Sequence, residues 1–176
     1  MQLVQSDVLD AHTQAEALLL TIDGQHRSLR GNAAHQFIRR WGEESYEDFE
    51  RGLTFPIALG GVVRVDADTD APWRTILFAS TLHHLDTLDE AGKIGVLQRG
   101  LAKALAACEL GGIRTLATAP LKGGWRLEAI AAYAAMMPVY DASGFRRNGG
   151  KLLVCCRETA EYEALVAVHR AKRGVG

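Results

Sequence analysis

Residues that could do chemistry cluster where strands are predicted to end. The tripeptide Ser6-Asp7-Val8 follows a short apolar pair, Leu3-Val4, and Asp23 follows the continuous apolar run Ala17–Ile22. A carboxylate at the exit of a strand can accept a hydrogen bond from an exocyclic amine such as that of adenine. Aspartate is also a common turn residue, so Asp7 taken alone fits a purely structural role as well.

A second candidate is the loop formed by residues 119–126, Ala-Pro-Leu-Lys-Gly-Gly-Trp-Arg, between a predicted strand and a predicted helix. Gly123 and Gly124 let backbone N–H groups approach a ligand, and the start of the following helix favours negative charge. Lys122 and Arg126 add positive charge, so the loop suits a phosphate, although Gly-Gly also forms ordinary turns. No Lys-Ser or Lys-Thr follows the glycines, which excludes a P-loop, and the dinucleotide fingerprint is also missing.

The histidines and cysteines predict no further chemistry. His83, His84 and Asp86 could suggest a metal, but adjacent histidines on a strand point to opposite faces and no third ligand follows from the spacing. We therefore predict no metal site. The other histidines, at 12, 26, 35 and 169, are expected to be solvated. Three cysteines, two of them adjacent at Cys155-Cys156, form no disulfide framework and are expected to be buried thiols.

Composition limits the function classes. With 176 residues, 48% of them hydrophobic and 23% charged, the chain is expected to form a single globular domain over residues 1–176. A net charge of −1 excludes an extended surface for nucleic acid. No apolar run approaches the length of a membrane span, and the cysteine usage is typical of a reducing, cytoplasmic compartment. The abundance of alanine and arginine is typical of a GC-rich bacterial genome.

An alternation of strands and helices has to position these loops. The apolar pattern predicts strands at 3–4, 17–22, 62–65, 74–79, 115–118 and 151–156, with helices at 32–52, 94–110 and 127–137 and a last one with Thr159 as its N-cap. Pro138 is expected to end the third helix, and 141–150 to be flexible. Helices between strands predict an α/β fold, a three-layer α/β/α sandwich with a mixed, mostly parallel sheet. Ligands of such sheets bind at the carboxyl ends of the strands.

In their order and spacing, these pieces resemble the macro domains, a family that binds ADP-ribose and related nucleotides. Residues 6–9 resemble the family's Gly-Asp-Ile-Thr motif, whose aspartate holds the adenine, and residues 17–23 resemble a strand that ends Asn-Ala-Ala-Asn. Residues 30–32 and 122–125 fall at the two phosphate loops, and 37–42 resemble the helix motif Ile-His-Arg-Ala-Ala-Gly. The resemblance covers almost the whole chain. It implies ligand contacts at Asp7, Val8, Asp23, Arg30, Gly31, Asn32, Lys122, Gly123, Gly124 and Trp125.

The sequence departs from the family at the residues that would contact the ribose and phosphates or carry out cleavage. Asp23 stands where hydrolysing members place an asparagine against the distal ribose, and Arg30-Gly31 replaces a run of four glycines. The aspartate and histidine that follow in those members align with residues 33–34 and 37–38, which here are alanines and large apolar residues. The usual acid and base for cleavage are therefore missing, and Asp23 is the remaining candidate catalytic residue.

Three functions stay open from the sequence. The resemblance favours binding of ADP-ribose or a related adenine nucleotide, free or on an ADP-ribosylated protein, without turnover and without a cofactor. The first alternative is a hydrolase of ADP-ribosyl esters or of the 1″-phosphate that works through Asp23 or through a loop residue such as Lys122. The second is a scaffold for protein–protein contact that has lost its nucleotide, because a fold alone does not determine a function.

Overall fold

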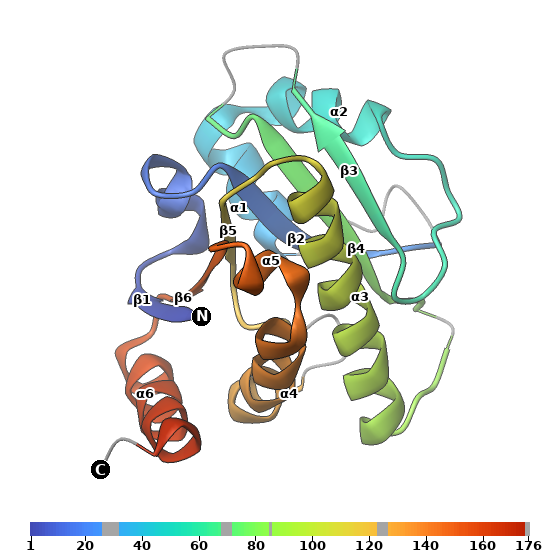
Figure 1. Cartoon of the computed structure of the whole chain (residues 1–176). Helices are drawn as coiled ribbons and strands as arrows, with labels where there is room; N and C mark the ends of the chain where they lie inside the picture. Colours follow the sequence, from blue (N-terminus) through green and yellow to red (C-terminus); the bar gives the residue numbers. More distant parts are fainter. Residues whose placement is uncertain (26–31, 68–71, 85, 123–126, 175–176) are drawn as a thin grey trace.

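A mixed β-sheet forms the centre of the molecule (Figure 1). The computed structural model describes residues 1–25, 32–67, 72–84, 86–122 and 127–174. The strands lie in the order β1-β6-β5-β2-β4-β3; all neighbours pair in parallel except β3, which runs antiparallel to β4 at the edge. The strands are β1 (Gln2–Gln5), β2 (Ala17–Asp23), β3 (Val62–Asp66), β4 (Thr75–Leu82), β5 (Thr115–Thr118) and β6 (Lys151–Cys156).

The central strands are buried on both faces, as their continuous apolar sequences predict. In β2, Leu18 and Leu20 pack into the core on one face of the sheet, whereas Leu19 packs into the core on the other face. The same alternation places Cys155 in one core and Cys156 in the other, and all three cysteines of the chain are free and buried. Side chains along a strand alternate between faces, so one sheet supports two cores.

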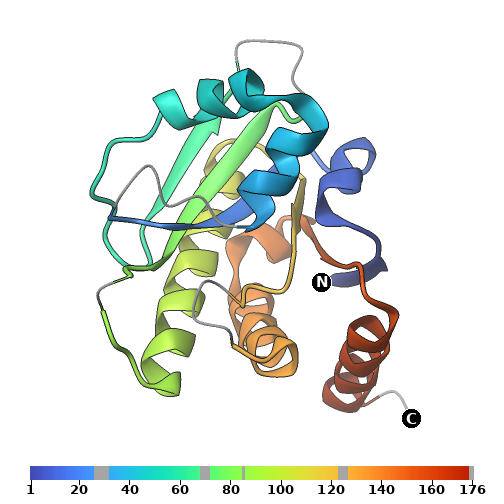
Figure 2. The same ribbon diagram turned by 180° about the vertical axis from the view of Figure 1, so that it is seen from behind.

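Helices cover both faces, which confirms the three-layer α/β/α sandwich. The 3₁₀ helix η1, α1 and α2 pack on one face, and α3, α4, α5 and α6 contribute to the core on the other face (Figures 1 and 2). These helices are η1 (Val8–Thr13), α1 (Asn32–Trp41), α2 (Glu43–Arg51), α3 (Glu90–Leu110), α4 (Ala129–Ala142), α5 (Gly144–Arg147) and α6 (Thr159–Arg173). Among the described residues, no helix combines the length and the apolar character that a membrane span requires.

The prediction of one helix over 32–52 was wrong, because the chain forms two helices separated at Gly42. The backbone of Gly42 has φ of 87°, a left-handed value that side-chain-bearing residues rarely adopt. The break turns α2 so that Tyr46 and Phe49 both meet the ring of Phe37, with ring centroids 5.6 and 6.0 Å apart. Burial of this aromatic cluster fixes the bend between α1 and α2.

The segment around Pro138 also differs from the prediction. Helix α4 continues through Pro138 to Ala142, where the sequence predicted an end. A proline inside a helix disrupts the bonding of the preceding turn, and the side-chain amide of Gln98 donates to the carbonyl of Ala135 there at 3.3 Å. The expected flexible stretch at 141–150 contains α5, which buries Phe145. Here tertiary packing outweighs local sequence preference.

The N-cap of the last helix differs by one position from the prediction. Glu158 occupies the cap, and the hydroxyl of Thr159 instead accepts a hydrogen bond of 3.0 Å from the side chain of Gln5. The expectation of a solvated histidine is also wrong at 169, because His169 is only partly exposed and lies 2.7 Å from the Tyr133 hydroxyl. Both contacts tie α6 to the rest of the fold.

The parallel strands bring their carboxyl ends to one edge of the sheet. In the order of the strands along this edge, Asp7 follows β1, Arg157 follows β6, Lys122 lies beyond β5, Asp23 ends β2, and His84 follows β4. Adjacent strands are about 4.8 Å apart, so the three steps from β1 to β2 span about 14 Å. Asp7 and Asp23 therefore lie at the same edge of the sheet.

Candidate functional site

A pocket of about 230 Å³ opens at this edge, over the ends of β1, β5 and β6. Three of the predicted ligand contacts, Asp7, Val8 and Lys122, line it together. Further lining comes from α1, from the end of β6 and from the first turn of α6. Among the described residues, the lining consists of residues 6–9, Ala33, Gln36, Ala119, Pro120, Lys122, residues 155–158 and Glu161.

Asp7 has a structural role as well as a place in the pocket. It is the N-cap of η1, and its Oδ1 accepts a hydrogen bond of 2.9 Å from the backbone N–H of Leu9. Its Oδ2 forms an ion pair of 3.2 Å with Arg40 of α1, and the Asp7 side chain is 15% exposed. Arg40 also binds Asp10. The carboxylate is thus oriented by the backbone and neutralised by a cation that solvent can reach.

A second ion pair lies across the pocket. The Nζ of Lys122 is 2.7 Å from Oε2 of Glu161 on α6, and both side chains are partly exposed. Arg157, also in the lining, pairs with the neighbouring Glu158 at 3.0 Å, and both of these side chains are largely exposed. The cations of the pocket are therefore already balanced by carboxylates, and an anionic ligand would have to replace those partners.

The two cysteine thiols in the pocket are poor nucleophiles. Burial, followed by the neighbouring Glu161 carboxylate, raises the pKa of Cys156 to about 12. Burial also raises the pKa of Cys155, more than the adjacent Ser6 hydroxyl lowers it. The reactive form of cysteine is the thiolate, so both thiols stay protonated and inert at neutral pH. The two cysteines therefore contribute to the shape of the pocket and not to its reactivity.

Asp23 lies farther along the edge and is not among the residues that line this pocket. Its side chain is 3% exposed. Oδ1 accepts from the backbone N–H of Gln25 at 2.8 Å, and Oδ2 accepts from the backbone N–H of His84 at 3.0 Å. Oδ2 is also 3.2 Å from Nδ1 of the His84 ring, whose side chain is 44% exposed. A buried carboxylate thus holds a solvent-accessible imidazole.

The two neighbouring histidines have different partners. His83 places Nε2 2.9 Å from the carbonyl oxygen of Ile57 and Nδ1 3.4 Å from the Asp86 carboxylate, whereas His84 turns to Asp23. In the part of the chain that the structure describes, no three histidine, cysteine, aspartate or glutamate residues group as metal ligands. His83 and His84 therefore point to different partners and do not form a common set of metal ligands.

The sequence matches no family model, and no curated protein matches it either. Solved structures do match. The macrodomain of Thermus aquaticus DarG, 21% identical, superposes with a TM-score of 0.63 over 88% of this chain and 97% of its own. The macrodomain of Mycobacterium tuberculosis DarG, also 21% identical, gives a TM-score of 0.62 over 88% and 95%. A variant macrodomain of Oceanobacillus iheyensis with ADPR, 13% identical, gives 0.72 over 98% and 92%.

The chain has the macrodomain fold. At these identities the likeness establishes the architecture, and the side chains of the site have to be judged from their own contacts. Within the macrodomain fold of this chain, the contacts divide the carboxyl edge into two parts. One is the pocket beside Asp7, and the other is the Asp23–His84 pair.

Several predicted contacts fall outside the described residues of this macrodomain fold. Asn32 is the first residue of α1. Arg30, Gly31, Gly123, Gly124 and Trp125 lie outside the described ranges. Their roles stay predictions.

Sequence reasoning missed four residues that the macrodomain fold brings to the edge. Arg40 and Gln36 come from α1, Glu161 from α6, and His84 from the end of β4. Arg40 is separated from Asp7 by 33 positions, Glu161 from Lys122 by 39, and His84 from Asp23 by 61. No local motif indicates such pairs, and the last one depends on the pairing of β2 with β4.

Proposed function

We propose that the cleft at the carboxyl edge of the sheet binds ADP-ribose or a related adenine nucleotide. The observation that carries this proposal is the Asp7 carboxylate, which lines the pocket while the backbone N–H of Leu9 fixes its orientation. A carboxylate accepts hydrogen bonds only, and adenine presents an amino group as donor on its six-membered ring. Macrodomain structures with ADPR and with ADP support the same class of ligand.

The length of the edge fits an extended ligand. Asp7 and Asp23 end strands that lie three steps apart in the sheet, a span of about 14 Å. A base at Asp7 would therefore direct a diphosphate over the end of β5, where Lys122 lies, and a second ribose toward the end of β2. This direction assigns the adenine to the pocket and the distal sugar to the Asp23–His84 end.

Ion-pair exchange is the expected cost of binding a diphosphate. Lys122 has to leave Glu161, and Arg40 has to share Asp7 with the incoming base. Partly exposed ion pairs contribute about 0–1 kcal/mol each, so these exchanges reduce affinity only modestly. The positive charge of Lys122 would then face the diphosphate, and the Glu161 carboxylate would be solvated by water.

A thermal-shift and calorimetric titration with ADP-ribose, ADP and AMP tests the proposal. A ligand that binds only the folded state raises the free energy of unfolding by about 2.7 kcal/mol at a hundred times its Kd. GDP is the matched control, because guanine carries an acceptor oxygen where adenine carries the amino donor. If no adenine ligand raises the midpoint, the proposal is wrong and the scaffold function is favoured.

One observation favours hydrolysis as a second candidate function. The Asp23 carboxylate accepts two backbone N–H groups and is buried, so it is poorly placed to act as a free base. It instead holds Nδ1 of His84, and this pairing directs the opposite ring nitrogen, Nε2, toward proton transfer. A buried aspartate that orients a histidine is a recurrent arrangement for general-base catalysis.

In this second function His84 would activate a water at the anomeric carbon of the distal ribose. The bond between that carbon and the leaving oxygen breaks, a bond to the water oxygen forms, and the water proton passes to Nε2 and then to the leaving group or to solvent. Asp23 would be the positioning residue. The products are ADP-ribose and the free acid or phosphate.

Release of ADP-ribose from an ADP-ribosylated protein tests this second function. The variant His84→Gln keeps the backbone N–H that Asp23 binds and removes the base, so release should fall about 100-fold or more while the Kd for ADP-ribose stays within about threefold. Loss of release in Asp23→Ala but not in His84→Gln would show that Asp23 is the base, as the sequence predicted. No release by the parent protein would leave binding alone.

A further inference from the structure

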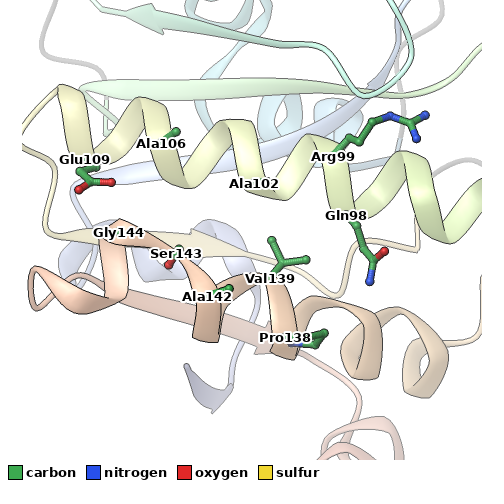
Figure 3. Close-up of a pocket in the computed structure, with 10 residues that line it drawn as sticks. All are labelled: Gln98, Arg99, Ala102, Ala106, Glu109, Pro138, Val139, Ala142, Ser143 and Gly144. Atoms are coloured by element: carbon green, nitrogen blue, oxygen red, sulfur yellow. The ribbon is translucent and has the colours of Figure 1, made fainter.

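A second, larger groove lies on the helical layer that contains α3 and α4. It has a volume of about 540 Å³ and runs along α3 from Arg99 at one end to Glu109 at the other (Figure 3). It shares no lining residue with the pocket beside Asp7. Half of its ten lining residues are small. These are Ala102 and Ala106 on α3 and, on the opposite wall, Ala142, Ser143 and Gly144.

The exposed face of α3 has a symmetric order of side chains. Arg99 and Glu109 are equally far from Ala104 in opposite directions along the helix, and so are Ala102 and Ala106. The spacings of three, four and three residues put all four on one face. Figure 3 shows Arg99 and Glu109 toward opposite ends of this part of α3, with the Arg99 side chain directed away from α4 and the alanines between the two. The helix therefore carries opposite charges about 15 Å apart, with a flat small-residue surface between them.

We propose that this face binds the same face of a second copy of the chain, with the two α3 helices antiparallel around a twofold axis beside Ala104. In that arrangement Arg99 of each copy meets Glu109 of the other, and Ala102 meets Ala106. A twofold interface requires a self-complementary surface, which this order of charges provides. Small side chains at the crossing allow the helix axes to approach to about 8 Å.

Leu110 supplies the apolar part of this interface. It is 90% exposed, the most exposed large hydrophobic side chain in the described residues. The antiparallel pairing carries Leu110 of one copy to the Gln98 end of the groove in the other copy. Pro138 of α4 lies at that end and offers an apolar wall (Figure 3). An exposed leucine and an open groove of the same molecule thus cover each other.

The charge at the Glu109 end remains able to receive an arginine. Oε1 of Glu109 accepts a hydrogen bond of 2.6 Å from the side-chain amide of Asn148 on the exposed surface. A carboxylate has about four acceptor positions, so Oε2 can bind a guanidinium in addition. A second copy satisfies both ends of the groove at once, which explains why we assign the surface to it and not to another protein.

Sedimentation velocity across a range of protein concentrations tests this interface. We expect a concentration-dependent dimer for the parent chain, and an increase of the dimer Kd by about tenfold or more in Arg99→Glu and in Glu109→Arg, because each change places like charges together twice. The combined variant Arg99→Glu/Glu109→Arg should restore dimerisation, since the swapped charges pair again. Arg170→Glu, an exposed charge reversal on α6, is the matched control and should leave the Kd unchanged.

Every other outcome overturns the proposal. A parent chain that stays monomeric up to a protein concentration of about 100 μM has no such interface. A parent dimer that tolerates the single reversals uses another surface. Failure of the combined variant to recover, with an unchanged unfolding midpoint to show that it folds, means that the two residues do not face each other.

Discussion

The carboxyl edge of the sheet holds two aspartates in contrasting environments. Asp7 sits at the wall of a pocket, where one oxygen binds the backbone and the other binds the side chain of Arg40. Asp23 is almost wholly buried and binds two backbone N–H groups together with the His84 ring. Both lie at strand exits of the same sheet, yet Asp7 is held by one backbone N–H group and Asp23 by two.

The contrast lies in what replaces each contact when it breaks. Arg40 is 30% exposed, so water can solvate it when a base takes its place at Asp7. The backbone donors bound by Asp23 lie at a buried position, where an unmatched N–H is expensive. Asp7 is therefore suited to recognition, and Asp23 to holding the ends of β2 and β4 together.

The largest effect is expected for the stability of Asp23→Ala. Removing the carboxylate leaves two backbone N–H groups and the His84 ring without their acceptor, which should lower the free energy of unfolding by about 3 kcal/mol or more. Urea unfolding of the variant and the parent measures the difference. Asp7→Ala, which loses a 3₁₀-helix cap and a partly exposed ion pair, should lose about 1 kcal/mol or less. Equal losses in the two variants would remove the contrast.

The effect on ligand binding should have the opposite order. Asp7→Ala should weaken ADP-ribose binding by about 1–3 kcal/mol, the size of a lost hydrogen bond to a charged group. Asp10→Ala is the matched control, because Asp10 also pairs with Arg40 but does not line the pocket. Calorimetric titration should show a change only for Asp7. If both variants bind ADP-ribose like the parent, Asp7 does not contact the base.

A smaller effect, in the direction of tighter binding, is expected for Glu161→Gln. The change releases Lys122 from its 2.7 Å ion pair, so the ammonium group can face a diphosphate without leaving a carboxylate. The Kd for ADP-ribose should fall about threefold, and the gain should shrink at high salt. Glu163→Gln, an exposed change on the same helix, serves as the control. Unchanged affinity would place the diphosphate away from Lys122.

The smallest effect concerns pH and a residue remote from both aspartates. Burial, followed by the charge of Arg173, lowers the pKa of His169 below its ordinary 6.5, and Nδ1 of His169 lies 2.7 Å from the Tyr133 hydroxyl. The unfolded chain then takes up this proton more readily than the folded one, so stability falls as the pH drops below about 6.5 and recovers above it. His169→Gln should flatten this part of the pH dependence of urea unfolding. Comparisons of Asp7 with Asp23 are therefore cleanest above pH 7.

Much of the architecture follows from the sequence alone. The continuous apolar runs at 17–22 and 152–156 favour buried strands, and the amphipathic pattern that stops at Gly111-Gly112 predicts the end of α3. The predictions that failed were those in which a local preference met a packing demand. Pro138 should end a helix, yet Met136, Met137 and Tyr140 of α4 are buried on both sides of it. Local rules do not include the burial that offsets them.

In the candidate site, the sequence predicted which residues follow the ends of strands, but not which side chains contact them. Asp7 and Asp23 were found because strand exits are visible in the sequence, and the carboxyl ends of parallel strands share an edge. The partners that decide their roles, Arg40 and His84, belong to other elements and carry no signal of their own. A sequence motif specifies which residue leaves a strand, but not which side chain from another element meets it.

Hydrophobic periodicity and strand exits are local properties of the chain, so the sequence alone predicts the class of the fold and the strand exits at which Asp7 and Asp23 lie. The tertiary structure decided that Asp7 shares its charge with Arg40, that Lys122 pairs with Glu161, and that Asp23 is buried against His84. These contacts join residues 33 to 61 positions apart. Their free energies depend on burial and distance, which exist only after the chain has folded.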